Sequence, residues 1–315
     1  MSHSNTHTTT AKYVWKRKHF FASQEEKLDE YFLQKKEQLF KQLNLQNQNE
    51  ENQSLLALLP DPWSLKDIRK AAQRILLAIE QKEKITIFGD YDVDGTTSCA
   101  MLKEFFSALN YAVEIYIPDR LTEGYGLNPV GVKKLSQNGT KLIITVDNGI
   151  AALNACLEAQ NCHIDVIITD HHDVPAELPQ AFAILNPKQI DCLFPFKMLA
   201  GVGVAFYLMI ALRALLREIS PSYNNLILKN YLDYVAIGTI ADMAPLNGAN
   251  HILCKIGLEV LQMNLRQGKR LGLFELLKLA GWSENTQVCA ADIGFKIGPR
   301  LNAAGRLGNA LRSVD

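Results

Sequence analysis

The sequence predicts an α/β fold in which helices cover both faces of a mostly parallel sheet, followed by a helical segment. Short apolar runs alternate with amphipathic stretches from residue 85 to residue 185, as in chains built of parallel βαβ units. Beyond about residue 200 the pattern is almost wholly helical. The composition is that of a globular chain: 48% of the 315 residues are hydrophobic, and 33 basic residues balance 33 acidic ones. This composition excludes an intrinsically disordered protein.

The N-terminal region, residues 1–55, is predicted to be a polar tail with one helix. Apolar residues recur at helical spacing over residues 24–43, and a linker rich in Gln and Asn follows over residues 44–54. The Asp61-Pro62 dipeptide marks a turn, after which the spacing predicts a helix over residues 65–81.

Strands and helices are then expected to alternate. We expect strands at residues 85–89, 113–117, 142–146, 166–169 and 182–185, and helices at residues 96–109, 129–138 and 151–159. The apolar strands have the continuous hydrophobicity of strands buried on both faces. Further helices are expected at residues 202–219, 226–240, 252–264 and 273–279.

Several protein classes are excluded by what the sequence lacks. No apolar run reaches the length of about 18 residues that indicates a transmembrane helix, and the N-terminus has no apolar signal-peptide core. The six cysteines are scattered and form no CxxC pair, which argues against a zinc ribbon or a disulfide framework. We therefore expect a cytoplasmic protein.

Three aspartates, Asp90, Asp92 and Asp94, alternate directly after the first predicted strand. Like charges this close are costly unless a cation neutralises them. An EF-hand is disfavoured, since loop position 12 would be Met101. The string D-x-D-G-T at residues 92–96 also suits an aspartyl-phosphate phosphatase, and a plain turn with a helix cap is a further alternative.

The ends of two later strands favour a metal centre. Asp147 follows the strand at 142–146, and Asp170-His171-His172 follows the strand at 166–169. Parallel strands bring their carboxyl ends to one edge of the sheet. Mixed carboxylate and imidazole ligands indicate a first-row transition ion, with Mn²⁺ the first choice and Mg²⁺ the second. Two such ions, sharing a bridging carboxylate, would activate water for attack on a phosphoester.

Six sequence strings, in this order, resemble the DHH phosphoesterase superfamily and, within it, the RecJ family of bacterial exonucleases specific for single-stranded DNA. The strings are residues 90–95, 146–149, 170–172, 199–206, 238–246 and 298–306. The resemblance covers most of residues 12–315.

The resemblance implies a role for each candidate residue. One cation would be bound by Asp92 helped by Asp90, the other by Asp94, His171 and Asp242, and Asp147 would bridge the two ions. His172 would face the scissile phosphate, and Asp170 would orient the histidines. Substrate would be held by Arg300, Asn302 and Arg306. For Gly201 and Gly203, close approach of the backbone to a phosphate and tight helix packing remain equal alternatives.

The resemblance also implies a domain organisation. Residues 56–250 would form the DHH phosphoesterase catalytic domain, and residues 251–315 a helical connecting region that carries the Arg-Asn motif. The family continues with a glycine-rich DHHA1 domain and an oligonucleotide-binding (OB) barrel, which this sequence lacks. The expected protein is therefore the N-terminal catalytic part alone.

The expected function is 5′-to-3′ exonuclease activity on single-stranded DNA in recombination and repair, by a two-metal mechanism. The expected partners are single-stranded DNA and, as candidates, single-strand-binding protein and a recombination helicase, with no membrane. Two alternatives remain. One is an oligoribonuclease or small phosphoester hydrolase of the same superfamily, and the other is an inactive, truncated scaffold.

Overall fold

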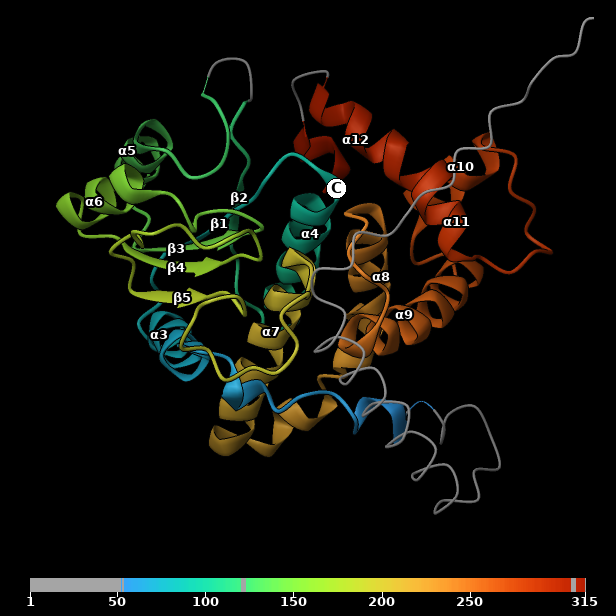
Figure 1. The fold of residues 1–315 in the computed structure, drawn as a ribbon, viewed down its shortest axis with the longest axis horizontal. Helices are drawn as coiled ribbons and strands as arrows, with labels where there is room; N and C mark the ends of the chain where they lie inside the picture. The colour runs from blue at the N-terminus through green and yellow to red at the C-terminus, as the bar shows by residue number, and fades with distance from the viewer. Residues whose placement is uncertain (1–51, 53, 120–122, 307–309, 315) are drawn as a thin grey trace, which may run out of the picture.

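The structure, a computed structural model, describes residues 52–314 except 53, 120–122 and 307–309 (Figure 1). The helix expected at residues 24–43 lies outside the described residues. Within them a sheet with its covering helices occupies one side of the molecule, and a helical region lies beside it (Figure 1). In this part of the chain, none of the helices combines the length and hydropathy that a transmembrane span requires.

The sheet has five strands, and every pairing between neighbours is parallel. This confirms the predicted fold class. The order in space is β2-β1-β3-β4-β5. The strands are β1 (Ile85–Phe88), β2 (Glu114–Tyr116), β3 (Leu142–Val146), β4 (Asp165–Thr169) and β5 (Ala183–Leu185).

Helices cover both faces of the sheet because successive strand residues point to opposite sides. Ile87 and Ile144 belong to an apolar cluster formed with α3 (Ile68–Glu80), α4 (Val93–Ala108) and α7 (Gly201–Ile219). Phe88 and Ile143, one position away, belong to a second cluster formed with α5 (Pro129–Gln137) and α6 (Leu153–Asn161). This double coverage explains why these strands are apolar throughout rather than alternating.

The strand order reverses at β1, which pairs with β2 on one side and with β3 on the other. Loops that leave the carboxyl ends of β1 and β3 therefore turn to opposite sides and leave a crevice between them. The loop after β1 contains the three alternating aspartates, and the loop after β3 contains Asp147. The topology thus brings the candidate ligands to the position where open α/β sheets bind their ligands.

The helical region packs on a third apolar cluster. Its helices are α8 (Leu232–Ala241), α9 (Gly248–Arg266), α10 (Leu271–Leu279), α11 (Ala290–Asp292) and α12 (Gly298–Arg306), with a π-helical turn at Ile293–Ile297. The helix expected from residue 226 starts later, because Leu228–Tyr231 forms a 3₁₀ turn before α8. Other 3₁₀ turns lie at Pro62–Ser64, Pro221–Asn225 and Ala310–Ser313.

A buried ion pair joins α10 to the centre of the molecule. Asp233, in the first turn of α8, has no exposed side-chain surface and accepts a hydrogen bond of 2.8 Å from Nε of Arg270 and one of 2.7 Å from Asn264. Arg270 also pairs with Glu104 of α4 at 3.0 Å and stacks on the ring of Tyr234. The Asp233 carboxylate therefore depends on Arg270 for its counter-charge.

We expect Arg270→Met to lower the free energy of unfolding by about 3–5 kcal/mol, because it leaves a buried carboxylate without its partner. Urea denaturation followed by circular dichroism measures the change. The control is Lys278→Met, which removes an exposed lysine that lies 3.8 Å from Glu275 and should cost less than about 1 kcal/mol. Equal stability of the two variants would contradict a structural role for the Arg270 pair.

Candidate metal centre

The loop between β1 and α4 positions the three alternating aspartates differently. Asp90 is buried, and its carboxylate accepts a 2.7 Å hydrogen bond from the backbone N–H of Tyr91. Asp92 caps α4, since its Oδ1 accepts from the N–H of Gly95 at 3.0 Å. Asp94 lies in the first turn of α4 and is buried. The capping alternative raised from the sequence thus applies to Asp92, while the other two carboxylates face the interior.

Asp94 is held by the N-terminus of α7. Its Oδ2 accepts a hydrogen bond from the N–H of Gly201 at 2.7 Å, and its Oδ1 accepts one from the N–H of Val202 at 2.8 Å. The positive end of the helix dipole stabilises a carboxylate at this place. A Cβ at Gly201 would lie 2.7 Å from Oδ1 of Asp147, so only glycine lets α7 approach the two carboxylates.

Asp147 follows β3 with a left-handed backbone, at φ 62°. Its N–H donates to the carbonyl of Thr169 at 3.0 Å, which continues the pairing with β4 and directs the side chain inward. The carboxylate is buried, and its Oδ1 accepts no hydrogen bond from the described residues. A buried carboxylate oxygen that accepts no hydrogen bond lowers the stability of the fold. Such an oxygen is available to a cation.

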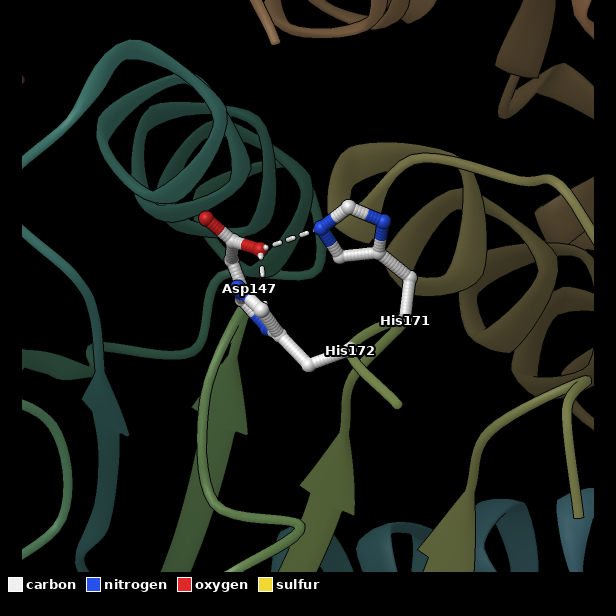
Figure 2. Close-up of side chains that lie close together, drawn as sticks. All are labelled: Asp147, His171 and His172. Carbon is white, nitrogen blue, oxygen red and sulfur yellow. Dashed lines mark ion pairs between the residues drawn. The ribbon is translucent and has the colours of Figure 1, made fainter. Parts of the chain in front are cut away.

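His171 and His172 follow β4, and both imidazoles lie next to the Asp147 carboxylate (Figure 2). Nε2 of His171 lies 3.0 Å from Oδ1 of Asp147, 3.8 Å from Asp94 and 3.9 Å from Asp242. Asp242 directly follows the last residue of α8 and enters from the helical region. One imidazole nitrogen therefore faces carboxylates from three separate segments of the chain.

Asp170 holds the two histidines in place. Its Oδ1 accepts from the N–H groups of His171 and His172 at 2.7 and 3.0 Å and contacts Nδ1 of His172 at 2.7 Å. Its Oδ2 accepts from the N–H of Ile150 at 2.8 Å. Burial opposes ionisation of Asp170, but the hydrogen bond with His172 and the backbone donors lower its pKa. This position suits a residue that orients the imidazoles.

The candidate ligand atoms fall into three overlapping sets. Oxygens of Asp90, Asp92 and Asp147 lie within 4.8 Å of one another, and so do atoms of Asp94, His171 and Asp242. A third set of the same dimensions joins Asp147 to both histidines. The structure therefore brings all the predicted metal ligands together, while their assignment to individual ions stays a prediction.

Four carboxylates of this cluster resist ionisation in the absence of cations. Burial, and then the neighbouring carboxylates, raise the pKa of Asp94 and Asp147 well above the ordinary value. Burial and Asp92 likewise raise the pKa of Asp90 to about 7 and that of Asp242 to about 6. Such an excess of negative charge fits divalent cations, which would remove the repulsion.

The two histidines differ in charge. Burial, and then the charge of His172, lower the pKa of His171 to about 4, so this imidazole is neutral at pH 7 and offers a lone pair. The hydrogen bond to Asp170 raises the pKa of His172, whose side chain is 48% exposed. His171 thus has the character of a ligand, and His172 that of a cationic group open to a bound anion.

We expect the metal-free protein to lose stability as the pH rises from 6.5 to 8. Asp90 holds its proton more tightly in the folded than in the unfolded protein, so its stabilising effect is present at lower pH and is lost as the pH rises through about 7. Asp242 acts in the same direction, but its effect is lost through about pH 6, below this range. The raised pKa of His172 acts in the same direction, and the lowered pKa of His171 matters only below about 6.5. Melting temperatures in EDTA measure the effect.

The pH control is Asp90→Asn, which should flatten this dependence because it removes one of the titrating carboxyls. A metal-free melting temperature that rises between pH 6.5 and 8 would contradict the charge excess inferred for the centre.

The three residues expected to hold substrate differ in position and in exposure. Asn302 lines a cavity of about 310 Å³, together with Ala241, the residue that precedes Asp242 in the sequence. The Oδ1 atom of Asn302 is buried and has no hydrogen-bond partner among the described residues. Arg300 is exposed and donates to the carbonyl of Lys296 at 2.9 Å. Both lie on helix α12. The Arg306 side chain lies outside the described part of the structure.

Two of the expected substrate contacts are not supported by the geometry. Gly201 is buried and its N–H is taken by Asp94. Gly203 is buried in α7, where an added Cβ would lie 3.2 Å from Leu199. For both glycines, close packing of α7 replaces contact with a phosphate, because neither backbone N–H group reaches the surface.

Two residues beside the cluster were not identified from the sequence. Tyr125 is half-exposed, hydrogen-bonds to Asp90 and lies edge-on to Tyr91 with ring centroids 6.1 Å apart. Lys188 lies in the segment after β5, and its charge acts on His171 and Asp242. The glycines that flank Tyr125 at positions 124 and 126 were the only sequence signal for it.

The fold and this cluster define a class of protein, which the comparison with known families identifies. Residues 84–239 match the DHH family, N-terminal domain. The match begins just before β1 and contains all the clustered residues except Asp242. The chain therefore belongs to the DHH family.

Within this family the chain is similar to RecJ exonucleases. It is 46% identical over 250 residues to the single-stranded-DNA-specific exonuclease RecJ of Bacillus subtilis (strain 168), a match that covers 79% of this chain and 30% of the relative. The chain thus spans about a third of that relative's length.

Three solved structures are similar to this chain. A crystal structure of exonuclease RecJ bound to manganese has a TM-score of 0.68 and 35% identity, covering 82% of this chain and 61% of that one. RecJ from Thermus thermophilus in complex with Mn²⁺ has a TM-score of 0.65 and 30% identity, covering 90% and 40%. Its complex with Mg²⁺ has a TM-score of 0.55.

Proposed function

We propose that this chain carries the catalytic centre of a metal-dependent exonuclease that hydrolyses single-stranded DNA from the 5′ end. The observation that carries the proposal is the convergence of carboxylates and an imidazole from the ends of β1, β3, β4 and α8. The similarity to RecJ exonucleases, including forms bound to manganese and magnesium, supports the same reaction and substrate.

The donor set fits two Mn²⁺ ions, or Mg²⁺ as the second choice. Asp90 and Asp92 would hold one ion, and Asp94, His171 and Asp242 the other. The buried Oδ1 of Asp147, which accepts no hydrogen bond from the described residues, would bridge the two. When bound, these cations supply Lewis-acid activation of water and neutralise charge on the phosphoryl group.

The protein's own groups position the reaction. Asp170 fixes the His172 ring through Nδ1 and favours its protonated form. A half-exposed imidazolium at this place would stabilise the charge that develops on the scissile phosphate, or donate a proton to the leaving oxygen. The hydrogen bonds from α7 hold Asp94 rigidly, so the ligand set is organised before cations enter.

The experiment that tests this function uses 5′-labelled and 3′-labelled single strands. With Mn²⁺ we expect mononucleotides from the 5′ end, no cleavage of duplex, and no cleavage in EDTA. Asp242→Ala, which removes a ligand with a partly exposed side chain, should remain folded and show no turnover. Faster hydrolysis of a dinucleotide than of the long strand would favour an oligoribonuclease-type hydrolase. Inactivity together with intact Mn²⁺ binding would favour a scaffold.

We propose the following organisation around this activity. Residues 56–250 form the catalytic unit, and residues 251–315 connect it to substrate through Arg300, Asn302 and Arg306. Helix α9 crosses residue 250 without a break, which makes the two parts continuous. All six cysteines are free, in keeping with a cytoplasmic location. Single-strand-binding protein and a recombination helicase are the proposed protein partners.

A further inference from the structure

The segment after β5 presents a lysine at the edge of the metal centre. Asn186 is fully buried, and its side chain donates to the carbonyl of His172 at 2.9 Å and accepts from the N–H of Lys188 at 2.8 Å. One amide therefore ties the backbone of Lys188 to the backbone of His172. The lysine cannot move away from the centre without breaking these bonds.

The Lys188 ammonium has only a weak partner. Its Nζ lies 2.9 Å from Oδ1 of Asp173, whose side chain is 97% exposed, and 27% of the Lys188 side chain is exposed. Exposed pairs of this kind contribute little and exchange readily. An arriving phosphate oxygen can therefore replace Asp173 at little cost.

The charge of Lys188 already reaches the centre, since it lowers the pKa of both His171 and Asp242. Among the lysines and arginines of the described residues, only Lys188 is a main cause of a pKa shift in the cluster. The cluster contains six aspartates, so two divalent cations would not neutralise it fully. An anionic substrate needs further positive charge there.

We propose that Lys188 is a substrate-binding residue that leaves Asp173 to contact a non-bridging oxygen of a DNA phosphate at the metal centre. The inference rests on the proposed function and adds a residue outside the six strings that carried the family resemblance. Lys188 binds the substrate in the ground state and the transition state alike, so its effect falls on KM.

The test compares Lys188→Met with wild type on a 20-nucleotide single strand with Mn²⁺. Loss of one charged contact should raise KM about 10-fold and leave kcat within about 2-fold. The slope of log KM against log salt should fall by about 0.7, the value for one phosphate contact on a single strand. Lys188→Arg should keep KM within about 3-fold of wild type because it keeps the charge.

A substitution of Asp173 tests the role of Lys188 independently. Asp173→Asn should lower KM about 2- to 3-fold by releasing Lys188, and this gain should disappear in the double variant with Lys188→Met. The control is Lys133→Met, since Lys133 is a lysine paired with a carboxylate away from the metal centre, Glu158 on α6, and its loss should leave KM and the salt slope unchanged.

An unchanged KM in Lys188→Met, or a loss confined to kcat, overturns the inference while the proposed function stands. If wild type does not degrade the strand, the proposed function fails. Anisotropy of the labelled strand with the Asp242→Ala variant, with and without Lys188→Met, then decides the role of Lys188. A difference of about 10-fold in Kd supports it, and equal Kd values overturn it.

Discussion

Replacing Asp147 with asparagine is expected to abolish turnover, with a loss well above 100-fold. Substitutions of groups that only orient metal ligands already cost about 10- to 100-fold, and Asp147 is itself a candidate ligand, close to Asp90 and Asp92 and to both histidines. Asparagine is the informative replacement because it tolerates the left-handed backbone at φ 62°. Alanine would add strain there. The rate on a labelled single strand with saturating Mn²⁺ measures the effect.

The same Asp147→Asn variant should be more stable than wild type when both are free of metal. Burial and neighbouring carboxylates raise the pKa of Asp147, so its ionised form destabilises the fold at pH 8. The neutral amide removes this penalty. A control, Asp165→Asn, removes a carboxylate that lies 2.6 Å from Arg74 at the other end of β4 and should leave turnover unchanged. A variant at Asp147 that kept the wild-type rate would contradict the proposed centre.

Manganese is expected to raise the melting temperature strongly. An ion at 100 times its Kd stabilises the folded state by about 2.7 kcal/mol, and two ions by about twice that. At about 2–4 °C per kcal/mol for domains of this order of size, the rise is roughly 10–20 °C. Differential scanning calorimetry at pH 8, with Mn²⁺ or with EDTA, measures it.

Two controls make the thermal shift specific. Ca²⁺ should give a smaller rise, because an imidazole ligand suits Mn²⁺ better than a cation that prefers oxygen ligands. Asp147→Asn should lose most of the rise. An identical shift for wild type and Asp147→Asn would place the ions elsewhere on the protein.

The sequence was most informative where local pattern and topology coincide. Apolar runs with bounds close to those of β1, β3 and β4 were visible in the sequence, and a parallel sheet necessarily brings their carboxyl ends together. The predicted convergence of Asp94, Asp147 and His171 therefore needed no side-chain detail. Asp242 was different, because it follows helix α8 and its position depends on how α8 packs. Only the resemblance identified it.

Other features depended on tertiary contacts that no local pattern reveals. Substrate contact and helix packing were equal alternatives for Gly201 in the sequence, and its role follows from the approach of α7 to Asp94. Lys188 owes its position to the side chain of Asn186. Arg300 and Asn302 lie on a helix that follows a π-helical turn, a backbone form with no simple sequence signal.

The most direct test of the account is the number of Mn²⁺ ions bound per chain, measured by equilibrium dialysis on wild type and Asp147→Asn at the same free concentration. We expect two ions for wild type and fewer than two for the variant, since the Asp147 carboxylate would be shared by both ions in the proposed centre. No binding by wild type, or two ions that are unaffected by the substitution, would contradict it.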